Sequence, residues 1–310
     1  MQLYKSRDFG AFFQDTFTFL KENGKHYFKH FFIVNGVFLL IMAVVMYFFW
    51  NFYTELLFGG IAANDATMID GYMNDNFGLF ILFFLVFLIV ALLAGLVSYA
   101  FTAIYLKLYA KNGKSFGTKD LVAGYKNNVG RLLIFLICGI LIGIPIMMVL
   151  GLFSFILIIT IVGMLALPLI LGTFMIFYSM TLMEYIEEKR SIWDSFGYAW
   201  NLLTSKFWSA SGSVALFFVM AYILQNIVVM IPYMFGMVNF LTTIENSNQV
   251  EDASASFMVI MMVVLLLSYL LGTVLNQIVQ INQGIIFYSL KEDKEHINTI
   301  DVIDQIGSSE

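Results

Sequence analysis

The longest uncharged run in the chain covers residues 132–183, fifty-two consecutive positions without Asp, Glu, Lys, Arg or His. A transmembrane helix needs about 20 apolar residues, so a single span would be far too long and two spans joined by a tight apolar hairpin fit the run. Three spans would place the basic residues from Lys189 onward on the opposite side of the membrane from the others. The sequence leaves open whether the hairpin tip within 151–163 leaves the bilayer.

Four further apolar stretches are each long enough to cross a membrane. The 310 residues are 60% hydrophobic and only 12% charged, which excludes a soluble globular protein and is typical of an all-α polytopic membrane protein. We therefore predict a single six-span membrane domain over 1–290 and a polar cytoplasmic tail over 291–310. The expected spans are about 31–50, 77–106, 132–150, 160–183, 213–235 and 257–288.

The distribution of charge predicts the topology of these spans. The two polar loops expected over 51–76 and 236–256 contain seven acidic residues and no Lys or Arg, so all sixteen basic residues fall on the other side. Because Lys and Arg are enriched in cytoplasmic loops, we expect both termini in the cytoplasm. Thirteen lysines against three arginines are typical of an AT-rich bacterial genome. The predicted location is the bacterial cytoplasmic (inner) membrane, as a multi-pass protein.

Residues 184–212 predict an amphipathic helix lying on the membrane surface. Ser191 and Asp194, three residues apart, resemble a capping box at its start. One face carries aromatic and aliphatic residues at steps of three or four, and Trp prefers the headgroup zone, where its ring is half buried and its N–H stays hydrated. Phe196 and Leu203 complete this face. The expected membrane-surface anchors are Trp193, Trp200, Phe207 and Trp208.

Two shorter segments repeat this arrangement in weaker form. In residues 8–30 and 107–131, apolar side chains again recur at helical spacing. Similar short sequences containing Tyr lie where the chain leaves the second, fourth and sixth spans, at 104–107, 177–180 and 287–291. We call them Tyr-containing exits. We therefore expect three copies of one unit, in which an amphipathic surface helix precedes a hairpin of two transmembrane helices. The apolar faces are Phe9, Phe13, Phe17 and Leu20 in the first segment, and Leu121, Tyr125, Val129 and Leu132 in the second.

Amide side chains within the fifth and sixth spans are the candidate functional residues. They could line a polar groove for a headgroup or small solute, or they could form interhelical hydrogen bonds worth roughly 0.6 to 2 kcal/mol each. Helical spacing places Asn276, Gln280 and Gln283 on one face, and depth along the helices makes Asn276 the better partner for the fifth span. The candidates are Gln225, Asn226, Asn276, Gln277, Gln280 and Gln283.

Several functional classes lack their sequence signals. No acidic, basic or histidine residue lies deep in an expected span, although pumps and voltage sensors need them, and no hydrolase, zinc-protease or nucleotide-binding motif occurs. Glu22, His26 and His30 would share a helix face as possible metal ligands, but Gly24 interrupts that helix. We therefore expect no catalytic residue, metal or cofactor. The net charge of −5 does not favour nucleic acid.

The pattern Gly139-x-x-x-Gly143 in the third span suits close packing of two helices.

One segment carries a family resemblance. Glu187, Ser191-Ile-Trp-Asp-Ser195, Trp200, Leu203 and Phe207-Trp208, followed by an apolar run, resemble a pattern in a loose group of six-span bacterial membrane proteins. That group includes the membrane domain of some glycerophosphodiester phosphodiesterases and YciC-like proteins of unknown function. The soluble phosphodiesterase barrel is absent here, so its activity does not carry over. The resemblance implies a six-span inner-membrane protein without known catalysis.

These observations lead to two functional hypotheses. The first is a non-enzymatic scaffold or accessory subunit that binds membrane lipids or a membrane-protein partner. The second is a transporter or flippase-like protein for a lipid or amphiphile, using the amide face of the sixth span. A water-filled groove lined by Gln280 and Gln283 would favour the second hypothesis, and a closed bundle the first.

Overall fold

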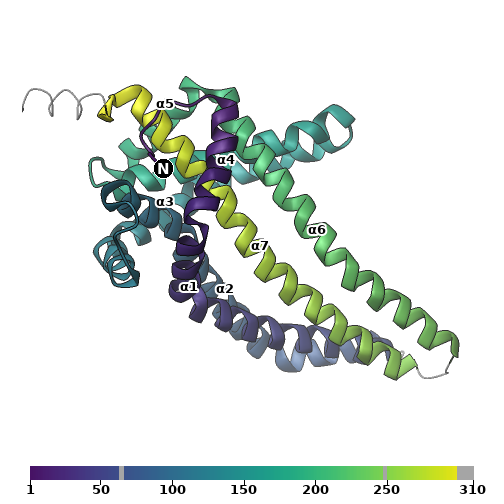
Figure 1. Ribbon diagram of the computed structural model, residues 1–310. Helices are drawn as coiled ribbons and strands as arrows, with labels where there is room; N and C mark the ends of the chain where they lie inside the picture. Colours follow the sequence, from purple (N-terminus) through teal and green to yellow (C-terminus); the bar gives the residue numbers. More distant parts are fainter. Residues whose placement is uncertain (63–65, 247–249, 299–310) are drawn as a thin grey trace, which may run out of the picture. The chain divides into compact units, whose positions relative to one another are not determined.

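A computed structural model of the chain describes residues 1–62, 66–246 and 250–298 (Figure 1). Within them every regular element is a helix, as the all-α prediction required. The seven helices are α1 (Phe9–Ala62), α2 (Ala66–Asn112), α3 (Thr118–Ile158), α4 (Ile161–Ile186), α5 (Ile192–Ser205), α6 (Phe207–Asn246) and α7 (Val250–Glu295).

Six of these helices are long and apolar enough to cross a membrane, so the prediction of a multi-pass membrane protein with six candidate spans is confirmed. The 14-residue α5 is too short to span a bilayer. The candidate spans within the helices are Phe9–Asn51, Phe77–Asn112, Thr118–Phe155, Ala166–Ile186, Phe207–Thr242 and Ser256–Glu295.

The helices extend much further than the sequence predicted. The expected loop over 51–76 is helical up to Ala62 and again from Ala66, and the loop expected over 236–256 is helical except for 247–249, which lie outside the described residues. Neither residues 8–30 nor residues 107–131 form a separate surface helix, because α1 continues unbroken from Phe9 and α3 from Thr118 into the spans. None of these segments contains a proline to end the helix. A lone glycine within a helix, such as Gly24, costs only about 1 kcal/mol.

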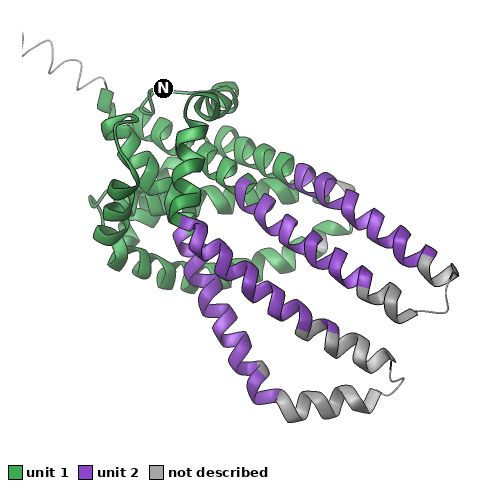
Figure 2. Cartoon of the chain, turned by 60° about the horizontal axis from the view of Figure 1, so that its bottom comes forward, with its two compact units in different colours: residues 1–34, 98–221, 275–310 green, residues 35–97, 222–274 purple. Residues whose placement is uncertain are grey.

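The chain divides into two compact units that share four helices (Figure 2). Unit 1 comprises residues 1–34, 98–221 and 275–310, and unit 2 comprises residues 35–97 and 222–274. Helices α3, α4 and α5 belong wholly to unit 1. Helices α1, α2, α6 and α7 each contribute a segment to both units.

Aromatic side chains form much of the core of unit 1. Tyr27 of α1 lies 4.8 Å from Tyr105 and 5.1 Å from Phe101 of α2, measured between ring centroids. The buried face of α1 differs from the predicted one, since Phe9 and Phe17 are exposed. Polar residues interrupt the buried face of α1. The apolar periodicity of the sequence therefore pointed to the adjacent face of the same helix. The buried residues of this face are Phe12, Thr16, Phe19, Asn23, Tyr27 and Phe31.

The ends of three spans meet at Gly284 of α7. A Cβ atom there would lie 2.1 Å from Leu106 Cδ1 of α2 and 3.2 Å from Met183 Cε of α4. Only glycine allows this close approach without displacing Leu106. The second, fourth and sixth spans therefore pack together where the three similar Tyr-containing exits occur, although the repeat itself stays a prediction.

Unit 2 has an aromatic contact and a hydrogen bond between its helices and an apolar exterior. The rings of Phe49 in α1 and Phe87 in α2 stack with centroids 6.0 Å apart, and the Trp50 indole N–H of α1 donates to the Met258 carbonyl of α7 at 3.1 Å. Large apolar side chains on its described surface are exposed, as expected for helices whose solvent is hydrocarbon. They include Val37, Leu40, Phe48, Leu79, Leu82 and Phe235.

Candidate functional site

A buried ionic cluster joins α4, α5 and α7 in unit 1. The Lys291 ammonium donates to Glu184 Oε2 at 2.6 Å, and neither side chain is exposed. Lys291 also donates to Glu187, and Arg190 donates to the second oxygen of Glu184. The Arg190 guanidinium lies 3.6 Å from Glu295 near the end of α7. Each buried charge therefore has an opposite charge beside it, which buried ions require.

Tyrosine rings enclose this ionic cluster. The Arg190 guanidinium carbon lies 3.8 Å from the Tyr198 ring centroid, a cation–π contact, and the Tyr198 hydroxyl donates to Glu295. Burial, followed by the hydrogen bond to Glu295 and its charge, raises the pKa of Tyr198 well above its ordinary value. Burial and the nearby glutamates, Glu187 first, likewise raise the pKa of Tyr4. Both phenols therefore stay protonated as hydrogen-bond donors.

Two cations cap the carboxyl end of α4. Lys107 of α2 donates to the Ile186 carbonyl at 2.6 Å, and Arg131 of α3 donates to the Tyr185 carbonyl at 2.8 Å. The last carbonyls of a helix lack partners within the helix and carry the negative end of its dipole. These contacts fix the last turns of α2 and the first half of α3 to the end of α4.

A second polar cluster links α7 to α1 and α2. The Gln277 carbonyl oxygen accepts hydrogen bonds from the Tyr27 hydroxyl at 2.7 Å and the Thr102 hydroxyl at 3.1 Å. Thr102 also lies within donor distance of Gln280 Oε1, at 2.9 Å. Since Tyr27, Thr102 and both glutamines are buried, this cluster serves as interhelical hydrogen bonding.

Asn282 makes a third set of contacts, which sequence reasoning did not select. Its amide nitrogen donates to Thr16 of α1 at 3.0 Å and to Ser213 of α6 at 3.1 Å. All three side chains are buried. Asn282 therefore joins three helices of unit 1.

The other predicted amides lie in different surroundings. In unit 2, Gln225 donates to the Ser268 hydroxyl at 2.9 Å, so the expected pairing of Gln225 with Asn276 is wrong. That expectation counted residues from the membrane ends and assumed spans of equal tilt. Asn276 is exposed, and Asn226 bonds to the Tyr222 carbonyl of its own helix.

Gln283 is buried, yet neither its amide nitrogen nor its oxygen has a hydrogen-bond partner among the described residues. The same holds for the amide nitrogen of Gln280. Orphaned buried amides cost about 1–3 kcal/mol each, so such groups usually bind a water molecule or a ligand.

The predicted anchors lie around α5 and the start of α6. Ser191 caps α5 by accepting a hydrogen bond from the Asp194 N–H at 3.2 Å, which confirms the expected helix start. Trp193, Trp200 and Trp208 are 61%, 53% and 73% exposed, whereas Phe207 is partly buried. The buried face of α5 centres on Ala199 rather than on the tryptophans. Its members are Ile192, Ser195, Phe196, Tyr198, Ala199, Leu202 and Leu203.

The two histidines considered as metal ligands make internal contacts. His26 Nδ1 lies 2.8 Å from the Tyr105 hydroxyl, and His30 Nδ1 lies 2.8 Å from the Thr118 hydroxyl. Their rings pack edge to face with centroids 4.4 Å apart. Among the described residues, no group of three His, Cys, Asp or Glu side chains is placed to hold a metal.

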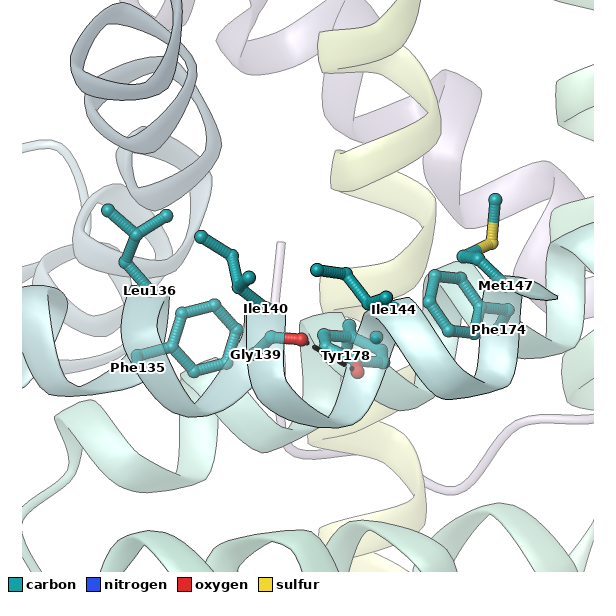
Figure 3. A pocket seen from close by; sticks show the side chains of 9 residues that line it. Phe135, Leu136, Gly139, Ile140, Ile144, Met147, Phe174 and Tyr178 are labelled. Carbon is teal, nitrogen blue, oxygen red and sulfur yellow. Dashed lines mark hydrogen bonds between the residues drawn. The ribbon is translucent and has the colours of Figure 1, made fainter. Parts of the chain in front are cut away.

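An apolar groove of about 340 Å³ runs between α3 and α4 (Figure 3). Gly139 and Gly143 leave space on α3, and the Tyr178 ring of α4 fills part of it, donating from its hydroxyl to the Gly139 carbonyl at 3.1 Å. The remaining space is bordered by a row of α3 side chains, which Figure 3 shows along one side of the helix. They are Leu136, Ile140, Ile144 and Met147.

Sequence reasoning missed the ionic cluster entirely. Glu184 and Lys291 directly follow apolar runs, so they looked like ordinary charged residues at membrane exits. No signal in the sequence separated them from exposed charges, although both side chains are buried. No protein-family model, curated protein or solved structure matches this chain.

Proposed function

We propose that this chain is a non-enzymatic scaffold or accessory subunit of the bacterial cytoplasmic membrane that binds membrane lipid at a tryptophan edge, defined by Trp193, Trp200 and Trp208. The observation that carries the proposal is the exposure of these three indoles beside a helix whose opposite face is buried. Exposed tryptophans favour the lipid headgroup zone. The exposed Lys189 just before α5 adds attraction to anionic lipid.

The ionic cluster supports this proposal by holding α5 in place. Arg190 lies just before α5 and bonds to Glu184 of α4, while Tyr198 of α5 bonds to Glu295 of α7. These contacts fix the helix just before its start and near its middle. A rigid helix presents its aromatic edge at a lower entropy cost than a mobile one.

The charge distribution indicates on which side of the membrane the tryptophan edge should lie. All sixteen Lys and Arg residues belong to unit 1, and none belongs to unit 2. The positive-inside rule then favours a cytoplasmic location for both termini and for the tryptophan edge.

The proposal is tested with a Trp193→Ala, Trp200→Ala, Trp208→Ala triple variant. The lipid phosphorus retained per protein after purification in mild detergent should fall, while the melting temperature stays within a few degrees of wild type. Tyr222→Ala, which removes an exposed aromatic ring from unit 2, should retain wild-type lipid. Unchanged lipid retention, with loss of one co-purifying protein, would instead identify the edge as a protein interface.

The second candidate is a transporter or flippase-like protein, and one observation favours it. The buried amide of Gln283 has unsatisfied donors and acceptors that could bind a passing headgroup or solute. Gln283→Leu should then leave thermal stability intact and remove lipid exchange between leaflets of reconstituted vesicles. Equal exchange rates for wild type, Gln283→Leu and empty vesicles would exclude this candidate.

A further inference from the structure

The groove between α3 and α4 lies within two candidate spans, Thr118–Phe155 and Ala166–Ile186. Its described lining is apolar, and rim residues such as Ile144 are exposed. A volume of 340 Å³ falls at the lower end of the range of about 300–1,000 Å³ found for ligand sites. An apolar hollow at membrane depth fits a hydrocarbon occupant, because water would find no polar partner there.

A partner helix fits this groove less well than a lipid chain does. The Gly139-x-x-x-Gly143 pair would ordinarily let a second helix approach closely. Here the Tyr178 ring already lies against both glycines, since added Cβ atoms would meet it at 3.5 and 3.2 Å. The glycine surface is therefore covered by the chain itself, and a narrow channel beside Tyr178 is left.

The polar end of the groove lies near two cations. Arg131 lies four residues before Phe135 on α3, so the two side chains are neighbours one helical turn apart. Only one nitrogen of the Arg131 guanidinium has a hydrogen-bond acceptor among the described residues, the Tyr185 carbonyl. Lys107 bonds to the adjacent Ile186 carbonyl, lies 3.9 Å from the exposed Glu188 carboxylate and remains partly exposed itself. The other donors of these cations suit phosphate oxygens.

We propose that the groove binds an anionic phospholipid, with an acyl chain beside Tyr178 and the headgroup phosphate at Arg131 and Lys107. The lining extends from Phe135 to Met147, twelve residues or about 18 Å, which is close to half of the ~30 Å hydrocarbon core. One chain of one leaflet therefore matches its length. This inference rests on the proposed lipid binding but assigns a site separate from the tryptophan edge.

The test is native mass spectrometry of the full chain, titrated in detergent with phosphatidylglycerol or with phosphatidylcholine of the same acyl chains. We expect phosphatidylglycerol to bind more tightly than phosphatidylcholine. Arg131→Gln should weaken the first phosphatidylglycerol about tenfold, as expected for the loss of one charge-assisted contact, and should weaken phosphatidylcholine less, because its choline already offsets the charge of its phosphate. Lys126→Gln, which neutralises an exposed lysine of the same helix, is the matched control.

A second pair of variants tests the groove without touching any charge. Ile144→Trp should fill the groove and weaken both lipids, whereas Leu141→Trp, at an exposed position outside the lining, should weaken neither. Wild-type binding by Arg131→Gln and Ile144→Trp would overturn the proposal, as would a change in oligomeric state in Ile144→Trp alone. Retained lipid in the tryptophan triple variant, lost on adding Ile144→Trp, would support the groove while contradicting the tryptophan edge.

Discussion

Helices α1, α2, α6 and α7 each contribute one segment to unit 1 and another to unit 2, and the two sets of segments differ in composition. Unit 1 contains all sixteen Lys and Arg residues, with buried ion pairs and amide clusters between its helices. Unit 2 contains no Lys or Arg and seven acidic residues. The same helices are therefore stabilised by different interactions along their lengths.

Buried polar groups distinguish the two units, since large apolar side chains such as Leu141 and Leu152 are exposed in unit 1 as well. Exposing large apolar side chains to water costs about 25 cal/mol per Å², so the exterior of unit 2 suits hydrocarbon. Helices in lipid gain little from apolar contact, which leaves packing and a few hydrogen bonds such as Gln225–Ser268. Unit 1 specifies its arrangement by pairing buried polar groups, and each such group is costly to leave unpaired.

The largest expected effect concerns the sidedness of the two units. Alkaline phosphatase fused after Lys111, Arg190 or Lys291 should be inactive, because these positions belong to the segments that carry the basic residues, and such segments should face the cytoplasm. Fusions within 63–65 or 247–249 should be active. Green fluorescent protein at the same five positions should give the reverse pattern. Activity after any of the three basic positions would break the assigned topology.

The next effect tests the ionic cluster of unit 1. Lys291→Met leaves the mostly buried Glu187 without an ion-pair partner among the described residues, while Glu184 keeps Arg190, and should lower the free energy of unfolding by about 3–5 kcal/mol. Chemical unfolding in detergent measures this change. Lys294→Met, one turn away and exposed, should cost less than about 1 kcal/mol, the loss of a surface cation–π contact with Tyr198.

A double variant tells whether the charge or the packing matters. Combining Glu187→Leu with Lys291→Met also removes the glutamate that the single variant leaves unpaired, while Glu184 keeps Arg190, so it should recover part of the stability lost in Lys291→Met alone. If the double variant loses as much free energy of unfolding as the two single variants together, or more, the pair acts by shape rather than by charge compensation.

Much of the fold, and little of the site, could be predicted from the sequence. Span number follows from apolar length, and the start of α5 follows from Ser191 and Asp194, because both are local properties. The buried face of α1 could not be found, since Thr16 and Asn23 interrupt its apolar pattern. The pairing of Glu184 with Lys291 joins residues 107 positions apart, and a sequence pattern carries no information on such contacts.

Amides provide a direct comparison of the two units. Gln277→Leu in unit 1 removes the acceptor shared by the Tyr27 and Thr102 hydroxyls and the donor to Ser98, and should cost about 1–3 kcal/mol. Gln225→Leu in unit 2 removes a single side-chain partner, Ser268, and should cost about 0.6 kcal/mol. Thermal unfolding of the two variants in one detergent checks the order. Equal losses would contradict the division into polar and apolar packing.

The smallest expected effect is a pH dependence centred on Tyr198. Burial and then Glu295 raise the folded-state pKa of Tyr198 above its unfolded value of about 10. The stability from its protonated hydroxyl is therefore complete below pH 10 and is lost as the pH rises toward the folded pKa. Tyr198→Phe should cost about 1 kcal/mol near pH 8, the value of one hydrogen bond, and this cost should shrink by pH 11.

Melting curves from pH 8 to 11 measure that difference, and comparing wild type with Tyr198→Phe cancels the titration of the other tyrosines. Tyr222→Phe removes an exposed hydroxyl from unit 2 and should differ little from wild type at any pH. If Tyr198→Phe kept the same deficit at pH 11 as at pH 8, the hydroxyl would contribute by packing alone. The bond from Tyr198 to Glu295 would then not be what fixes α5 to α7, and rigid presentation of the tryptophan edge would depend on Arg190 alone.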